Sequence, residues 1–191
     1  MRKYGIWRIK QKIMLTDFDI TEYRKRIWNL EKWFTRRYGG GKTLSVGGGN
    51  APFGDISCDP LLPRDVKCVG EFLPFRPKSF DTILIYSVLD HCLDPVKLLK
   101  ECKNVGNKIL IMQTIIPFHI ELLIRLKFLL LKKKIPTINN IDTFHMRHYT
   151  FSKLVKHLVK AELTITECIL VYELSYKHRF LACMIAFISA K

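Results

Sequence analysis

Short apolar runs alternate with segments of helical spacing along this chain of 191 residues. Four runs suit strands that are buried on both faces of a sheet, at 43–46, 56–58, 80–86 and 108–112. The pair Asp94-Pro95 is typical of a helix start, and helical spacing follows from Val96 to Cys102. This alternation of strands and helices predicts an α/β fold with a mostly parallel sheet.

The last third of the chain continues the pattern. The residues predict two final strands over 164–172 and 180–189. Near the other end, Tyr23, Ile27, Leu30 and Phe34 recur at helical intervals within 20–37, with basic residues on the remaining faces. We therefore expect an amphipathic basic helix there, capped near Asp17 or Asp19 and ended by three glycines at 39–41.

A glycine turn follows the first central strand. The run Val46-Gly47-Gly48-Gly49-Asn50 lets the backbone approach a ligand and adopt positive φ, and Asp59 ends the next strand. A carboxylate at that position can accept both hydroxyls of a ribose, so the pattern predicts a nucleoside site. On these residues alone, a tight loop is the alternative. The chain lacks the Lys-Ser/Thr pair of a phosphate-binding loop, and Pro52 interrupts a dinucleotide fingerprint.

Further motifs follow in order at Leu73-Pro74-Phe75, Ser79-Phe80-Asp81 and Leu89-Asp90-His91. With the glycine turn, the stretch 43–113 resembles the class I S-adenosylmethionine-dependent methyltransferases, in particular the type 11 subgroup. The resemblance implies a Rossmann-like, doubly wound, seven-stranded sheet, mostly parallel with an antiparallel C-terminal edge hairpin. It also implies S-adenosylmethionine as the cofactor.

Two departures from the family pattern are visible. Only Asn50 to Asp55 separate the glycine turn from the second strand, so we expect the first crossover helix to be shortened. At the third strand, Val69 stands where the family places an aspartate that meets the adenine amino group. We expect Glu71, or the backbone around Gly70, to replace it.

The resemblance and the residues together give a set of candidate site residues. His91, just past the fourth strand, is the candidate catalytic base, although a role in the local fold is the alternative. The expected cofactor-binding residues are Gly47, Gly48, Gly49, Asn50, Asp59, Glu71 and Ser87. No metal site is expected, because the six cysteines lack the spacing of zinc ligands and lie mostly in apolar runs.

The formal net charge of +15 is unevenly distributed. Residues 1–43 carry twelve Lys/Arg and four Asp/Glu, residues 44–118 carry eight of each, and residues 119–160 carry nine and two. The expected cofactor-binding core is therefore neutral. The excess lies on the two flanking segments, where it favours an anionic substrate, an RNA or an anionic membrane surface. Solvated basic helices that only keep the protein soluble are the alternative.

The run 115–134 is apolar and ends in three lysines. Charged residues in its middle, among them Glu121, Arg125 and Lys127, exclude a membrane span. A helix that roofs the site and a helix that lies in a membrane interface both remain open. The start Met1-Arg2-Lys3 leads into no apolar stretch, and the cysteines suit reduced thiols, so we expect a cytoplasmic protein, peripheral to a membrane at most.

We expect a single methyltransferase domain with four parts. These are a basic N-terminal arm or lid at 1–42, a cofactor-binding core at 43–114, an inserted basic apolar cap at 115–149, and the last helix and edge strands at 150–191. The expected function is methyl transfer to a small-molecule or lipid-linked, anionic acceptor. An RNA methyltransferase and a non-catalytic methyltransferase-like partner subunit are the alternatives. The sequence leaves the oligomeric state open.

Overall fold

The computed structural model describes residues 9–16, 20–48, 53–62, 64–116, 122, 148–175 and 182–191. Three regular helices lie in these ranges: α1 (Ile20–Tyr38), α2 (Pro95–Val105) and α4 (Phe151–Lys160). The strands are β1 (Ile9–Thr16), β2 (Thr43–Val46), β3 (Ile56–Cys58), β4 (Phe80–Tyr86), β5 (Gly106–Ile115), β6 (Ile165–Ser175) and β7 (Ala182–Ala190). No helix among the described residues is long and apolar enough to cross a membrane.

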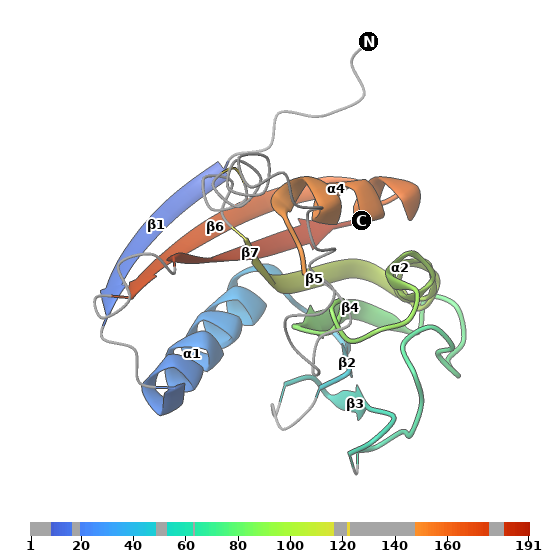
Figure 1. Cartoon of the computed structure of the whole chain (residues 1–191). Helices are drawn as coiled ribbons and strands as arrows, with labels where there is room; N and C mark the ends of the chain where they lie inside the picture. Colours follow the sequence, from blue (N-terminus) through green and yellow to red (C-terminus); the bar gives the residue numbers. More distant parts are fainter. Residues whose placement is uncertain are drawn as a thin grey trace.

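The described strands form one sheet in the order β1-β6-β7-β5-β4-β2-β3 (Figure 1). All neighbouring pairs are parallel except those that involve β7, which runs antiparallel to both β5 and β6. This arrangement confirms the Rossmann-like, mostly parallel α/β fold. It also confirms the four central strands, since the bounds of β4 coincide with the apolar run that predicted it.

Two details of the predicted sheet need correction. The C-terminal hairpin of β6 and β7 is not the outermost element, because β1 pairs with β6 along its whole length. The third strand expected near Val69 is reduced to an isolated bridge between Cys58 and Val66. The sheet has seven strands, but one of them, β1, comes from the N-terminal arm and was not among the strands that the sequence predicted.

The first crossover is compressed, as expected. Its described residues, 47–48 and 53–55, contain no helix. Phe53 is buried on this side of the sheet, and its ring lies 6.0 Å from the ring of Tyr86 at the end of β4. An aromatic side chain thus covers part of the sheet that a crossover helix would otherwise bury.

α2 begins where the sequence predicts. The Asp94 carboxylate accepts hydrogen bonds from the backbone N–H groups of Val96 and Lys97, both at 3.0 Å, and Pro95 occupies the first turn. Leu98 and Leu99 are fully buried against the sheet. α4 lies on the same face, where Leu154 and Leu158 join the same core cluster.

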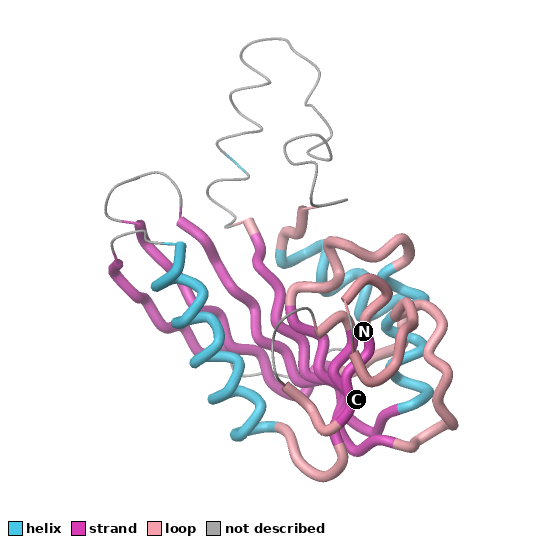
Figure 2. Tube along the Cα trace, turned by 90° about the horizontal axis from the view of Figure 1, so that it is seen from below, coloured by secondary structure: helices cyan, strands magenta, loops and turns pink. Residues whose placement is uncertain are grey.

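α1 covers the opposite face of the sheet (Figure 2). Phe34 is fully buried, and its ring lies 5.1 Å from that of Phe187 on β7. A side-chain hydrogen bond also joins α1 to β4, since the hydroxyls of Thr35 and Tyr86 are 2.6 Å apart. The described part of α1 therefore forms a layer of the core, and the role of the N-terminal arm as a lid stays a prediction.

A buried carboxyl group lies in the same layer. Glu31 is 4% exposed, and its Oε2 has no hydrogen-bond partner among the described residues. Burial raises the pKa of this carboxyl from its ordinary 4.5 to about 8, because the charged form loses its hydration. Burial raises the pKa of the neighbouring Tyr86 phenol as well. Ionisation of Glu31 would therefore place a buried charge between α1 and the sheet.

Phe34→Ala should lower the free energy of unfolding by about 3–5 kcal/mol, because it leaves a cavity between α1 and the sheet. Chemical denaturation measures this change. Trp33→Ala removes a neighbouring side chain that is 47% exposed, and we expect that variant to unfold nearly like the parent. Equal effects of the two substitutions would show that α1 does not contribute to the core as described.

Glu31→Gln should stabilise the protein increasingly as the pH rises from about 4.5 to 8. In this window the unfolded chain ionises Glu31 while the folded chain keeps it protonated, so the parent loses stability as the pH rises. Since each pKa unit is worth about 1.4 kcal/mol, the difference in unfolding free energy should reach at most about 5 kcal/mol. Denaturation at several pH values measures it. For the control Glu101→Gln, in α2, the stability difference from the parent should not grow in this way as the pH rises.

Candidate functional site

The candidate site lies where the carboxyl ends of β2, β3, β4 and β5 meet. The parallel register places Val46 beside Cys58 on one side and beside Ile85 on the other, and Tyr86 beside Met112. The chain leaves β2 toward β3 on one side and returns to β4 on the other, so the order of strands reverses between β2 and β4. Sheets of this kind bind ligands at such a reversal, outside the carboxyl ends of the strands.

The glycine turn caps β2 at this edge. Gly47 has φ +63°, and its N–H donates to the carbonyl oxygen of Cys58 at 2.8 Å. A Cβ at Gly47 would lie 2.8 Å from both methyl carbons of Val88. Gly48 follows with no side chain over the strand ends, whereas Gly49 and Asn50 lie outside the described residues. Only glycine fits position 47, both for its conformation and for its space.

Asp59 follows β3 directly at the same edge and is 8% exposed. Its Oδ1 accepts hydrogen bonds from the backbone N–H groups of Leu61 at 2.8 Å and Leu62 at 2.9 Å. The local turn therefore fixes the orientation of the carboxylate beside the glycine turn. A carboxylate held in this way can accept hydrogen bonds from the hydroxyls of a ribose. This role of Asp59 stays a prediction.

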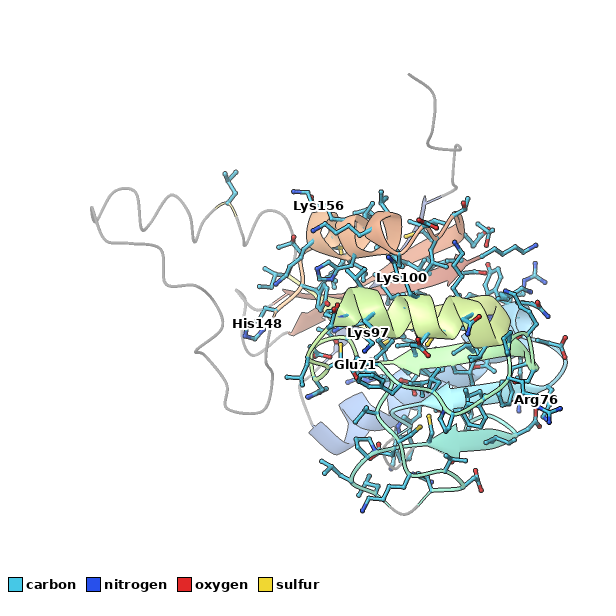
Figure 3. The ribbon with its side chains drawn as sticks, turned by 90° about the vertical axis from the view of Figure 1, so that its right-hand side faces the viewer. Glu71, Arg76, Lys97, Lys100, His148 and Lys156 are labelled. Atoms are coloured by element: carbon cyan, nitrogen blue, oxygen red, sulfur yellow. The ribbon has the colours of Figure 1, made fainter. Side chains whose placement is uncertain are left out.

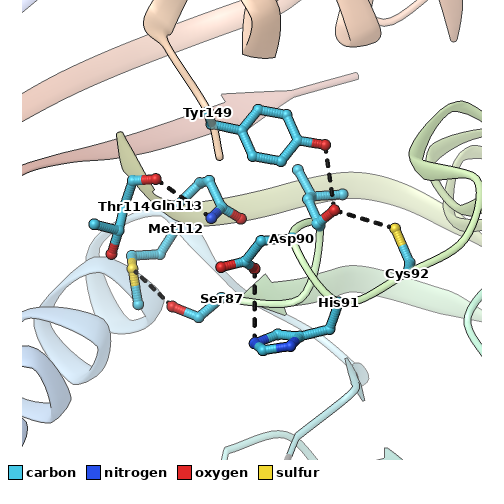
Figure 4. Close-up of polar contacts among 9 residues, drawn as sticks. Ser87, Asp90, His91, Cys92, Met112, Gln113, Thr114 and Tyr149 are labelled. Carbon is cyan, nitrogen blue, oxygen red and sulfur yellow. Dashed lines mark hydrogen bonds and ion pairs between the residues drawn. The ribbon is translucent and has the colours of Figure 1, made fainter. Parts of the chain in front are cut away.

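Ser87 ends β4 in an uncommon conformation. Its φ is +54°, its N–H donates to the carbonyl oxygen of Met112 at 2.8 Å, and its hydroxyl lies 3.7 Å from the Met112 sulfur (Figure 4). Non-glycine residues with positive φ cost free energy and cluster at functional sites. The conformation of Ser87 therefore agrees with a site at this edge, although its contact with a cofactor stays a prediction.

Glu71 has a contact that the sequence did not suggest. Its Oε1 accepts hydrogen bonds from the backbone N–H groups of Leu93 at 2.7 Å and Asp94 at 3.2 Å. The residue lies beneath α2 and is 8% exposed (Figure 3). It therefore supports the turn that enters α2. These two hydrogen bonds explain the position of Glu71 without a ligand, and its contact with adenine stays a prediction.

His91 lies in the turn between β4 and α2. Its Nε2 is 3.9 Å from Oδ1 of Asp90, and the histidine side chain is 41% exposed whereas that of Asp90 is 11% exposed (Figure 4). A buried carboxylate that faces an accessible imidazole can fix the orientation of the ring, as bases in active sites require. The catalytic role of His91 stays a prediction.

Two buried polar residues near this turn were missed by the sequence reasoning. Gln113, near the end of β5, is fully buried, and its Oε1 has no hydrogen-bond partner among the described residues. Tyr149 is 1% exposed, and its hydroxyl donates to the carbonyl oxygen of Leu89 at 3.2 Å (Figure 4). The signal for Gln113 was available, since it is a polar residue that interrupts the apolar run of a buried strand.

The described residues include no group of three histidine, cysteine, aspartate or glutamate side chains that could hold a metal ion. They do fit the nucleoside part of S-adenosylmethionine. The turn at Gly47 and Gly48 carries no side chain at the strand ends, and Asp59 presents an oriented carboxylate beside it. The site therefore combines a cofactor cradle on β2 and β3 with a polar group of Asp90, His91 and Gln113 on β4 and β5.

Comparison with known proteins agrees with this geometry. The family described as "Methyltransferase domain", of the type 11 kind, matches residues 55–108, from β3 to the start of β5. A curated relative, the uncharacterized protein YafS of Escherichia coli, is 27% identical over 146 residues, which is 69% of this chain and 56% of YafS. The chain thus spans about half the length of that relative.

Solved structures share the fold. A Thermotoga maritima S-adenosylmethionine-dependent methyltransferase, described as a possible histamine N-methyltransferase, has a TM-score of 0.57 at 16% identity, covering 90% of this chain and 95% of its own. A Bacillus halodurans protein, described as a candidate methyltransferase, has a TM-score of 0.61 at 12% identity, covering 84% of this chain and 97% of its own. Residues 55–108 thus match the methyltransferase family of the type 11 kind, and the whole chain is similar in fold to S-adenosylmethionine-dependent methyltransferases.

Proposed function

We propose that this protein is an S-adenosylmethionine-dependent methyltransferase that acts on a small-molecule or lipid-linked acceptor, which carries negative charge and presents an O–H or N–H nucleophile. One observation supports this most directly: the polar group of Asp90, His91 and Gln113 lies at the carboxyl ends of β4 and β5, next to the cofactor cradle. Polar side chains at this place can bind an O–H or N–H nucleophile and accept its proton.

The cofactor contributes the activated group. When bound, S-adenosylmethionine supplies a methyl group on a positively charged sulfur, so the protein has to position the acceptor and exclude water. In this proposal the backbone of Gly47 and Gly48 and the carboxylate of Asp59 hold the nucleoside. Ser87 presents its backbone to the same ligand from the end of β4.

His91 would act on the acceptor. The Nε2 atom of the ring faces Asp90, so Nδ1 is the atom that takes the proton. The nucleophilic oxygen or nitrogen forms a bond to the methyl carbon, the bond between sulfur and methyl breaks, and the proton of the nucleophile moves to Nδ1 of His91. Asp90 stabilises the charged ring that results.

The charge distribution supports an anionic acceptor. Residues 119–160 carry a net charge of +7, and in the described part of this segment α4 contributes Lys153, Lys156 and Lys160 without an acidic residue. Positive potential around a site raises the local concentration of anionic ligands and the rate at which they arrive.

Two experiments test the proposal in sequence. Calorimetry with S-adenosylmethionine establishes whether the cofactor binds, and absence of binding would favour the non-catalytic partner subunit. A screen with tritiated methyl donor then compares phosphorylated and carboxylated small molecules, lipid extracts and RNA as acceptors. Label transferred only to RNA would replace the proposed acceptor class by the alternative.

Asp59→Ala should weaken the binding of S-adenosylmethionine by about 1–3 kcal/mol, since it removes charge-assisted hydrogen bonds to the ribose. Calorimetry measures the change. Asp59→Asn is the matched control, because an amide oxygen can still accept the bonds from the N–H groups of Leu61 and Leu62. An affinity of the Asn variant between those of the parent and the Ala variant would show that both the negative charge of Asp59 and the turn that it stabilises contribute to binding. Unchanged affinity in both variants would mean that the ribose is held elsewhere.

His91→Ala should lower kcat by about 10²–10⁴-fold with an acceptor from the screen, which is the usual contribution of a general base. The affinity for S-adenosylmethionine should stay the same, because His91 lies outside the cofactor cradle. The residual activity should rise with pH as the acceptor ionises without help. A variant that retains full kcat would assign His91 to the local fold.

A further inference from the structure

Lysines line the outer surface of α2 and α4, which lie side by side on one face of the sheet (Figure 3). Glu101 is the one acidic residue within these two helices. Glu162, just beyond α4, lies 3.6 Å from Lys103 and compensates that lysine. We call the remaining five lysines of the two helices the lysine face: Lys97, Lys100, Lys153, Lys156 and Lys160.

Large apolar side chains project at one end of this face. Leu93, just before α2, is 78% exposed, and Phe72 is 65% exposed. The two are linked through Glu71, whose carboxylate accepts the N–H of Leu93 at 2.7 Å. The ammonium of Lys97 lies 3.3 Å from the centre of the Phe72 ring, so the apolar residues adjoin the lysine face directly. We call Phe72 and Leu93 the apolar tip.

We propose that the lysine face and the apolar tip together bind the surface of a bilayer that contains anionic lipids. A lysine near such a surface contributes about 1 kcal/mol of attraction, and exposed leucine and phenylalanine side chains gain free energy at the boundary of headgroups and acyl chains. Five lysines supply the charge, against Glu101 within α2 and Asp94 at its start, and the apolar tip supplies side chains for insertion.

The chemistry of the tip favours a bilayer over a single-stranded RNA. RNA-binding surfaces without sequence preference offer exposed aromatic rings on which bases stack. Here the ammonium of Lys97 lies over the ring of Phe72, and Leu93 has no aromatic ring. The same side chains suit a lipid interface, where a lysine reaches headgroups while an adjacent apolar group enters the boundary.

The position of the tip connects this surface to the candidate site. Leu93 ends the turn that contains Asp90 and His91, at the carboxyl edge of the sheet. A bilayer that holds the tip would therefore lie beside the site. This orientation rests on the proposed function and selects the lipid-linked member of its acceptor class.

Vesicle sedimentation tests the proposal with the full chain. We expect binding to vesicles with about one third phosphatidylglycerol in phosphatidylcholine and weak binding to phosphatidylcholine alone, since the lysines recognise anionic headgroups. Binding should fall strongly between about 0.05 and 0.5 M salt, because salt screens surface charge. Failure to bind anionic vesicles at low salt would overturn the proposal.

Charge reversals locate the surface. Lys100→Glu with Lys156→Glu changes two exposed residues of the lysine face and should weaken binding to anionic vesicles at least tenfold. Lys32→Glu with Arg36→Glu is the matched control, because both residues are exposed on α1, on the opposite face of the sheet. Equal losses in the two variants would show that only net charge matters, and would overturn the assignment to this face.

Phe72→Ser with Leu93→Ser tests the apolar tip. We expect weaker binding and a salt dependence like that of the parent, since the charges remain. Titration of the parent with labelled oligouridylate under the same salt conditions gives the competing outcome. Binding of this RNA through the lysine face without binding of vesicles would replace the bilayer by a nucleic acid.

Calorimetry with S-adenosylmethionine on every variant separates this inference from the proposed function. Variants of the lysine face should keep the cofactor affinity of the parent, as they lie on the outer surface of the helices. A parent that binds vesicles without binding the cofactor would leave the surface assignment intact and remove only the methyl transfer.

Discussion

The hydrogen bond from the N–H of Gly47 to the carbonyl of Cys58 holds the site together. It joins the ends of β2 and β3, and it requires the positive φ that glycine adopts without strain. On the other side of Gly47, the side chain of Val88 fills the space where a Cβ would stand, so the turn after β4 depends on the same residue. Asp59, Ser87 and His91 take their positions from these three strand ends.

The compressed crossover has a consequence for chemistry as well as for packing. A helix that begins after the glycine turn would offer free N–H groups to the anionic end of the cofactor. The described residues of the crossover, 47–48 and 53–55, contain no such helix. The missing packing of a crossover helix has a substitute, because α1 and Phe53 bury the face of the sheet that such a helix would cover.

The sequence predicted those features that depend on local signals. The apolar run of β4, the Asp94-Pro95 start of α2 and the glycine turn all lie within a few neighbouring residues. The missed features depend on distant partners. β1 is a strand because it pairs with β6, which follows more than a hundred residues later. Glu71 meets the turn at 93–94, and the burial of Glu31 follows from α1 packing on the sheet.

The carboxyl groups near the candidate site and the lysines of α2 and α4 occupy different parts of the molecule. Three acidic residues near the candidate site, Asp59, Glu71 and Asp90, are buried, whereas lysines predominate on the outer surfaces of α2 and α4. S-adenosylmethionine carries a cationic sulfur and an ammonium group, and carboxylates near its site favour these charges. The lysines attract anions without approaching the sulfur. Under the proposed function, this separation keeps the lysines that attract an anionic acceptor apart from the carboxylates near the cationic cofactor.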